Sequence, residues 1–417
     1  MVILRQQLLG MGVVAASSLL AINAAHAMSG PTPIQIDGGP LGPLELSGGL
    51  DGYGYYQTGS GVGAGNNVLN NYGITNRSSG FNVGSALIEL QKSSGVLQFT
   101  VEVGSNGGTT TLGARPTQTT VSQFSTGPLY EGYVTLAPKG SPVTVSAGMM
   151  VSLEGYEGAT DWSNPVQLTT AIFGVQNLNS RGVSLNFTKG PISATVMYGD
   201  GYNTGVFNFL QALVSYTFNA SNVLNVYYGG NLGQTGLNAK TYGGTCGYGE
   251  VDAEAGCFGT VGAYGPQFDN SQLVGAYYSY TMGNLNLVPE VQYQVAKANA
   301  KLGIYKQTSN FGAALFETYT FGKSPYSLGG WVEYFDSHGS SLNQAAGSDN
   351  WFLGPNSEAI GLAVAPTWQY KYLFARANAG FIYLLNNKGA DGFTYGYGAN
   401  GDGRAEFTGT LEAGVLF

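Results

Sequence analysis

The sequence predicts an all-β protein, namely a transmembrane antiparallel β-barrel of about 16 strands with short periplasmic turns and long external loops. Two observations lead to this prediction. Apolar residues alternate with polar or small residues in one segment after another, which is the two-residue period of a β-strand. The connections between these segments alternate strictly between short and long, a pattern typical of outer-membrane barrels.

The C-terminal segment shows the alternation most clearly. Phe417, Val415 and Leu411 fall on one face, whereas Glu412 and Glu406 fall on the other. An open strand edge in lipid leaves backbone groups unpaired, so we expect this segment to close the sheet against the first strand. An edge strand of a soluble β-protein is the alternative for this segment taken alone. The terminal aromatic, Phe417, resembles the assembly signal of such barrels, which makes the barrel assembly machinery an expected partner.

Residues 1–27 have the features of a secretory signal peptide. Arg5 supplies the positive charge, an apolar stretch follows, and Ala25-His26-Ala27 forms a cleavage site with small residues at both ends. A membrane anchor is the alternative, but the apolar stretch is short and two serines interrupt it. No later segment reaches the roughly 18 apolar residues that a spanning helix needs. The chain is therefore expected to leave the cytoplasm.

The mature chain is expected to form one barrel preceded by a short lead-in. Residues 28–43 contain four prolines and little pattern, which suggests a periplasmic lead-in, whereas residues 44–417 show a uniform pattern without a linker. The segments expected to be strands are 44–57, 81–92, 96–104, 129–137, 142–153, 181–188, 192–199, 207–218, 222–232, 272–282, 284–296, 309–321, 326–335, 358–370, 372–385 and 404–417.

The composition fits a barrel with a wet interior and a lipid-facing exterior. The chain has 66 Gly and 28 Tyr, but only 10% of its residues are charged. Cleavage after residue 27 removes Arg5 and leaves 15 basic against 24 acidic residues, a net charge of −9. Nucleic acid is therefore not an expected partner, since binding phosphates requires a basic surface.

Three segments of the chain resemble one family. Gly49-Leu50-Asp51-Gly52-Tyr53 in the first strand, residues 198–203 (Tyr-Gly-Asp-Gly-Tyr-Asn) and the terminal strand with Phe417 are similar to the putative β-barrel porin-2 (OmpL-like) family of Gram-negative outer-membrane proteins. General porins are similar in architecture. The resemblance implies a diffusion channel in the bacterial outer membrane, surrounded by lipid. By analogy with porins of this size it also implies a homotrimer. It implies no defined substrate residues.

The parity of each strand assigns an excess of acidic side chains to the lumen. With the apolar set of each strand placed toward lipid, the predicted pore-lining residues are Glu45, Asp51, Glu89, Glu102, Glu131, Glu290, Glu333, Arg376, Glu406 and Glu412. A narrow lumen focuses the field of its fixed charges, and rings of carboxylates favour cations. The alternative for any single carboxylate is a solvated wall residue without a role in selectivity.

The connection between the fifth and sixth predicted strands is a candidate constriction loop. In general porins the loop at this place folds into the lumen. The charged residues that we assign to it are Glu154, Glu157, Asp161 and Arg181, and apolar residues such as Ile172 are available to pack against the inner wall. The alternative is an external loop like its neighbours.

We therefore expect a water-filled porin that passes small hydrophilic solutes or ions by passive diffusion and favours cations. A plugged structural or adhesive barrel, whose external loops bind a partner, is the main alternative, and a soluble secreted β-protein is another. An enzyme is not expected, because His338 is the one histidine of the mature chain and leaves little material for a catalytic site. No cofactor and no metal site are predicted.

Cys246 and Cys257 lie in the longest predicted loop, residues 233–269. Two nearby cysteines in an exported chain favour a disulfide bond, whereas metal binding lacks a nearby histidine.

We predict that Cys246 and Cys257 are bonded to each other. Free-thiol labelling of the unreduced, unfolded protein should then find no reactive thiol, and reduction should leave the barrel intact because the bond closes only a loop. Two reactive thiols in the unreduced protein would contradict the prediction.

Overall fold

The computed structural model describes residues 28, 30–59, 78–106, 109–113, 129–236, 251–252, 257–258, 265–346, 350–389, 392, 394–398 and 401–417. Cys246 and the side chain of Cys257 lie outside the described residues, so the disulfide stays a prediction.

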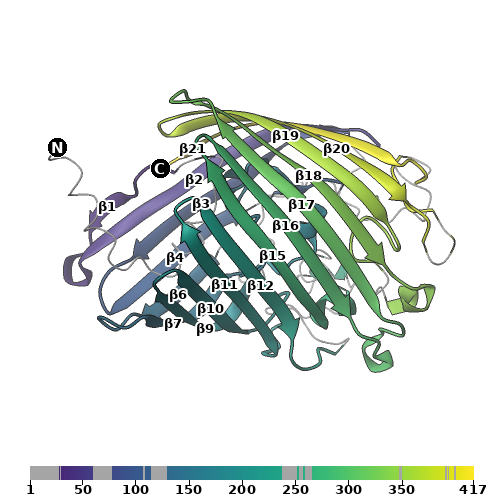
Figure 1. Cartoon of the computed structure of the whole chain (residues 1–417), viewed down its shortest axis with the longest axis horizontal. Coiled ribbons are helices and arrows are strands. Elements are labelled where there is room, and N and C mark those ends of the chain that lie inside the picture. The colour runs from purple at the N-terminus through teal and green to yellow at the C-terminus, as the bar shows by residue number, and fades with distance from the viewer. Residues whose placement is uncertain are drawn as a thin grey trace.

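Sixteen long strands in this part of the chain form one closed antiparallel sheet, in which each strand pairs with its neighbours along the sequence (Figure 1). The last strand pairs with the first and completes the barrel. The predicted fold class and strand number are therefore confirmed. The strands are β2 (Pro43–Gln57), β3 (Ser79–Lys92), β4 (Leu97–Asn106), β6 (Leu129–Leu136), β7 (Val143–Val151), β9 (Asn179–Lys189), β10 (Ile192–Gly199), β11 (Phe209–Asn219), β12 (Asn222–Asn231), β15 (Ser271–Met282), β16 (Leu285–Ala296), β17 (Thr308–Thr320), β18 (Tyr326–His338), β19 (Glu358–Tyr370), β20 (Leu373–Asn386) and β21 (Ala405–Leu416).

Short strands and helical turns lie at the ends of the barrel and in the connections between its strands. The short strands are β1 (Ile34–Asp37), β5 (Thr110–Thr111), β8 (Leu168–Thr169), β13 (Val251–Asp252) and β14 (Cys257–Phe258). The helical turns are η1 (Gly39–Leu41), η2 (Asp161–Ser163), α2 (Ala171–Gly174), α3 (Pro266–Asp269), η3 (Ala300–Leu302) and η4 (Ser341–Ala346). None of the described helices is long and apolar enough to cross a membrane.

Strand β1 was not expected from the sequence, which shows little pattern in the lead-in. It pairs antiparallel with the start of β2, with Ile34 opposite Leu46. The chain reverses at Gly42, whose φ of 81° lies in the region that glycine adopts without strain. Four residues between prolines are too few to show a period, so pairing with β2 decides their conformation.

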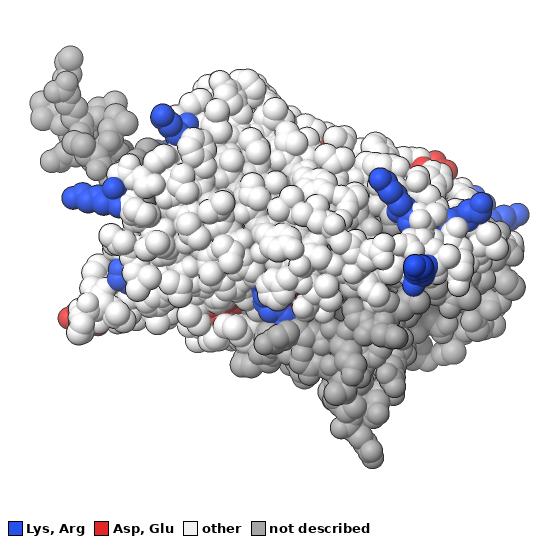
Figure 2. All heavy atoms as spheres, turned by 90° about the horizontal axis from the view of Figure 1, so that it is seen from below, with Lys and Arg blue, Asp and Glu red and all other residues white. Residues whose placement is uncertain are grey.

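The barrel wall separates an apolar outside from a polar inside. On β19, Ile360, Leu362 and Val364 are exposed, whereas the residues between them are buried. Terminal strand β21 exposes Phe407 and Leu411 and buries the two threonines between them and the glutamates on either side, as its alternation predicted. Figure 2 shows a face on which charged side chains gather toward the two ends and leave a largely uncharged band between them. A band of this kind is the surface that a barrel presents to lipid.

The closing seam lies between β2 and β21. Gly49 lies opposite Leu416 and Gln57 lies opposite Thr408. Beyond the last paired strand residue, Phe417 N donates to Gly48 O and Gly48 N donates to Phe417 O, each at 2.9 Å. The C-terminal residue therefore takes part in closing the barrel with its own backbone.

We predict that deleting Phe417, or replacing it with Glu, blocks assembly of the barrel more than it harms a barrel already formed. The terminal strand must present an apolar outer face and must pair at the seam. Heat-modifiable migration of the protein in outer-membrane fractions measures assembly, with Phe417→Tyr as the conservative control. Normal levels of folded protein for the deletion would show that the terminal residue is not an assembly signal.

Candidate functional site

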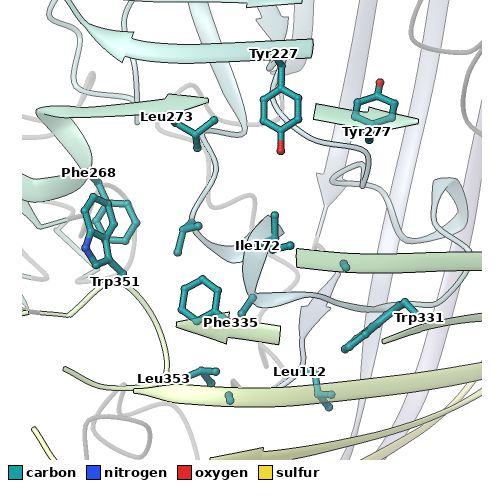
Figure 3. Close-up of a cluster of buried hydrophobic side chains, with 14 of the residues drawn as sticks. Leu112, Ile172, Tyr227, Phe268, Leu273, Tyr277, Trp331, Phe335, Trp351 and Leu353 are labelled. Atoms are coloured by element: carbon teal, nitrogen blue, oxygen red, sulfur yellow. The ribbon is translucent and has the colours of Figure 1, made fainter. Parts of the chain in front are cut away.

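The connection between β7 and β9, residues 152–178, lies inside the barrel. Its side chains Leu168 and Ile172 are fully buried, and they join one apolar cluster with inward-facing wall residues such as Trp331 and Phe335. Figure 3 shows Ile172 on its short helix between the labelled aromatic side chains of the wall. Apolar groups inside a wet lumen pack together for the same reason as in any protein core, because water is excluded from them.

Polar contacts hold this loop on strand β18. Trp331 Nε1 donates to Leu168 O at 2.7 Å. The Glu333 carboxylate accepts from Ala171 N at 2.9 Å and from Ile172 N at 2.8 Å. These two N–H groups begin helix α2 and have no partner within the helix, so Glu333 supplies the acceptors that the helix lacks. The predicted pore-lining residue Glu333 therefore lies against the loop.

The two glutamates of the loop bond to the loop itself. Glu157 accepts from Thr170 N at 3.1 Å and from Thr170 Oγ1, and Thr170 Oγ1 in turn caps α2 by accepting from Phe173 N. Glu154 Oε2 accepts from Asn177 N at 2.9 Å. Burial raises the pKa of Glu154 to about 8 and raises the pKa of Glu157 well above its ordinary value.

Arg376 fastens the first part of the loop to the wall. On β20, its guanidinium contacts both oxygens of Glu412 on β21, at 2.8 and 3.0 Å. The same guanidinium donates to Asn164 O at 2.8 Å and to Asp161 O at 3.0 Å. Both charged side chains are fully buried. The inward base that the sequence predicted therefore contacts the predicted loop residue Asp161 through its backbone.

A second loop enters the lumen, which sequence reasoning missed. Residues 109–113, between β4 and β6, place Leu112 in the apolar cluster, and Leu112 N donates to Thr169 O at 2.9 Å. The short strands β5 and β8 pair in parallel at this point. Phe268 and Leu353, from two further connections, join the same cluster (Figure 3). The sequence signal that could have indicated these inward loops is the presence of isolated bulky apolar residues in otherwise polar loops.

Most of the remaining predicted lumen carboxylates also have hydrogen-bond donors. Glu290 accepts from Tyr227 Oη at 2.6 Å, and Glu406 accepts from Gln57 Nε2 at 2.8 Å. Asp51 Oδ1 accepts from Ser85 N at 2.6 Å, and Glu45 accepts from Ser93 Oγ at 2.9 Å. These hydrogen bonds stabilise the barrel wall, so the carboxylates that accept them have a structural role.

Glu89, Glu102 and Glu131 form a separate acidic row. Glu89 lies opposite Glu102 on the neighbouring strand, and Glu102 lies opposite Glu131. Ser47 Oγ donates to Glu89 at 3.3 Å, and the structure gives the carboxylates of Glu102 and Glu131 no hydrogen bond within the described residues. Glu131 experiences the like charges of the other two.

A small cavity of about 50 Å³ adjoins the acidic row. It is lined by inward side chains of β6, β7, β9, β10 and β11, including Glu131, Asn186 and Thr195. Its lining extends from Ser193, near the short turn before β10, to Val151 and Leu153, where β7 enters the loop. The cavity therefore lies along the inner wall between the short turns and the loop.

The structure places Arg181 in strand β9 rather than in the loop. Arg181 Nε donates to Asp200 Oδ2 at 3.0 Å, and a second guanidinium nitrogen contacts the same oxygen. Arg181 N donates to Asp200 Oδ1 at 2.7 Å. This pairing fixes the start of β9 and neutralises the charge that the sequence assigned to the loop.

We predict that docking of the loop weakens at alkaline pH. The pKa of Glu154 rises from an ordinary 4.5 to about 8 on folding, so the folded state holds its proton more tightly. The resulting stabilisation is complete below pH 4.5 and is lost as the pH rises through about 8. The unfolding temperature, measured from pH 5 to pH 9.5, should fall less for Glu154→Gln than for the wild type.

Glu317→Gln is the control for this measurement, because Glu317 is exposed on the outer wall. Curves for Glu154→Gln and the wild type that run parallel through pH 8 would contradict the prediction.

Solved structures with similar folds are outer-membrane channels of low sequence identity. They include the outer membrane channel DcaP of Acinetobacter baumannii (12% identity, 90% of this chain, 97% of that chain, TM-score 0.54). OmpF of Salmonella typhi is similar as well (12% identity, 92% of this chain, 100% of that chain, TM-score 0.54). A third is the anion-selective porin from Comamonas acidovorans (12% identity, 90% of this chain, 99% of that chain, TM-score 0.51). At these identities the likeness shows the fold alone.

No curated protein sequence matches the chain. One family model does match, and it spans residues 43–417, which is the whole barrel from the first residue of β2 to the C-terminus. The resemblance found in the sequence is thereby confirmed. The chain belongs to the putative β-barrel porin-2, OmpL-like family of outer-membrane channel proteins.

Proposed function

We propose that this protein is exported with removal of residues 1–27 and forms a water-filled channel in the outer membrane. Small hydrophilic solutes and ions cross it by passive diffusion, and cations cross more readily than anions. Membership of a porin family supports the channel. The acidic row of Glu89, Glu102 and Glu131 is the single observation that supports the preference for cations.

The acidic row is the best source of a selective field. The other lumen carboxylates face hydrogen-bond donors or Arg376, which compensate their charge locally. Three carboxylates at adjacent register positions instead concentrate negative charge on one wall, and a narrow lumen with low-dielectric walls strengthens the field of such charges. Lipid around the barrel supplies that low dielectric.

The row and the loop act in series along the channel. On β3, Ser85 Oγ contacts the loop at Asp161, and Glu89 lies four residues closer to the short turn that joins β3 to β4. Four strand residues span about 13 Å. Solutes that pass the constriction formed by residues 152–178 therefore meet the acidic row next on their way to the periplasm.

The glutamates of the loop contribute little to selectivity in this proposal. Glu154 and Glu157 accept hydrogen bonds from Asn177 N and from Thr170 of the same loop, so their charge is compensated locally. The loop sets the width of the channel, and the strands set its charge. A neighbour described as anion-selective shares the fold, so the fold leaves the sign of selectivity to individual side chains.

We predict a cation preference that depends on the acidic row. In a planar bilayer with a salt gradient, the reversal potential of the wild type should have the sign for cations and should shrink at high salt as screening increases. Glu102→Gln combined with Glu131→Gln should lower the permeability ratio roughly twofold or more. Glu317→Gln, a loss of the same charge on the outer wall, should leave the ratio unchanged.

Clear anion preference of the wild type at neutral pH would contradict the assignment of the lumen. An unchanged ratio in the double variant would remove the acidic row as its cause. Cross-linking in detergent tests the predicted homotrimer independently, because a monomer can conduct as well as a trimer.

A plugged structural or adhesive barrel is the second candidate function. The extent of the apolar cluster favours it, since Val166, Leu168 and Val175 of the loop are fully buried against the wall and against other loops. Conductance separates the two functions. A plugged barrel gives no steady current, whereas the proposed porin gives steady open channels.

A further inference from the structure

Three carboxylates from distant parts of the chain meet where the loop touches the closing seam. Asp51 belongs to β2, Asp161 to η2 and Glu412 to β21. One oxygen of each lies within 4.8 Å of an oxygen of the other two. All three residues are at most 3% exposed. This group, called the seam cluster below, is the only such set of possible metal ligands among the residues that the structure describes.

Two oxygens of the seam cluster have no hydrogen-bond donor. Asp51 Oδ1 accepts from Ser85 N at 2.6 Å, and Asp161 Oδ1 accepts from Trp162 N at 3.1 Å. The second oxygens, Asp51 Oδ2 and Asp161 Oδ2, are buried without a partner. An unpartnered carboxylate oxygen is costly to bury, so each such oxygen in a native structure requires an explanation.

The same two oxygens border a space that a glycine keeps open. A Cβ atom built on Gly84 would collide with both Asp51 Oδ2 and Asp161 Oδ2. Any other residue at position 84 would therefore fill the space between the carboxylates. The two oxygens converge on one point from the wall and from the loop.

The net negative charge of the seam cluster favours binding of a divalent cation. Three carboxylates against the single guanidinium of Arg376 leave a net charge of −2 when all are ionised. Calcium takes oxygen ligands at about 2.3–2.6 Å, so two of its ligands lie up to about 5 Å apart. The oxygens of the cluster lie within 4.8 Å of one another, which is inside that limit. Magnesium keeps several waters and is usually held by only one or two carboxylates, so a buried set of three carboxylates suits calcium better.

We propose that Asp51, Asp161 and Glu412 bind one calcium ion, with the facing oxygens Asp51 Oδ2 and Asp161 Oδ2 as its central ligands. The ion joins the first strand, the last strand and the loop at one point. It fastens the loop to the barrel next to the contact that Arg376 makes, and it stabilises the closed seam. This site is independent of the solute that the channel carries.

Calcium binding can be measured on the full barrel in detergent after treatment with EDTA. Isothermal titration calorimetry should find one calcium ion per chain, and calcium should raise the unfolding temperature. Asp51→Asn and Asp161→Asn should each weaken binding tenfold or more, as should Gly84→Ala, which fills the space but keeps all three carboxylates. Asp336→Asn, a part-exposed carboxylate at the far end of β18, should bind calcium like the wild type.

Terbium gives a second readout that needs no ligand variant. Trp162 adjoins Asp161 and should sensitise the luminescence of bound Tb³⁺, and calcium should displace the ion. Trp162→Phe should abolish the luminescence while calorimetric calcium binding remains. The terbium measurement tests calcium binding at the seam cluster even if the aspartate variants fail to fold. Heat-modifiable migration shows whether each variant is folded.

Three results would overturn the proposal. One is absence of calcium binding to the wild type at millimolar concentration near pH 7, the outcome expected if Asp51 and Asp161 share a proton. The second is calcium binding that survives in folded Asp51→Asn and Asp161→Asn alike. The third is Tb³⁺ luminescence that is unchanged in Trp162→Phe.

Discussion

Backbone groups inside a bilayer have no water to bond to, and this constraint determines most of the structure. Every spanning strand must pair on both sides, so β2 has to meet β21 and the sheet has to close. A closed sheet of sixteen strands encloses a wide lumen, which the loops of the chain narrow from inside. The seam is therefore both the last pairing that the barrel needs and the place where the loop contacts Asp51 and Glu412.

The carboxylates that face the lumen have two different roles. Glu333 and Glu412 act structurally, the first by accepting from the N-terminus of α2 and the second by holding Arg376 against the loop. Glu102 and Glu131 have no such role, and their register places them side by side on the wall. Sequence parity treats all four alike, although we propose that only the second pair shapes the field that an ion meets.

The strands were predictable from the sequence because their signal is local. A period of two over 8 to 15 residues survives errors of one or two residues at each end, so all sixteen strands were found. The contacts inside the lumen were not predictable, since Asp51 and Asp161 are 110 positions apart in sequence and meet only after the barrel closes. Leu112 gave a weak signal, and Arg181 was assigned to the loop because it stands at the border, at the first residue of the predicted strand 181–188, whereas β9 begins at Asn179.

The central claim is that residues 152–178 stay docked on the inner wall while solutes pass beside them. Ile172 Cβ lies 3.6 Å from where a Cβ on Gly312 would be, within the range of a disulfide. Ile172→Cys with Gly312→Cys, in a chain whose Cys246 and Cys257 are replaced by serine, locks the loop to β17. The predicted result is a single-channel conductance that stays the same whether this bond is oxidised or reduced. A channel that closes on oxidation and reopens on reduction would show that the loop must leave the wall for solutes to cross.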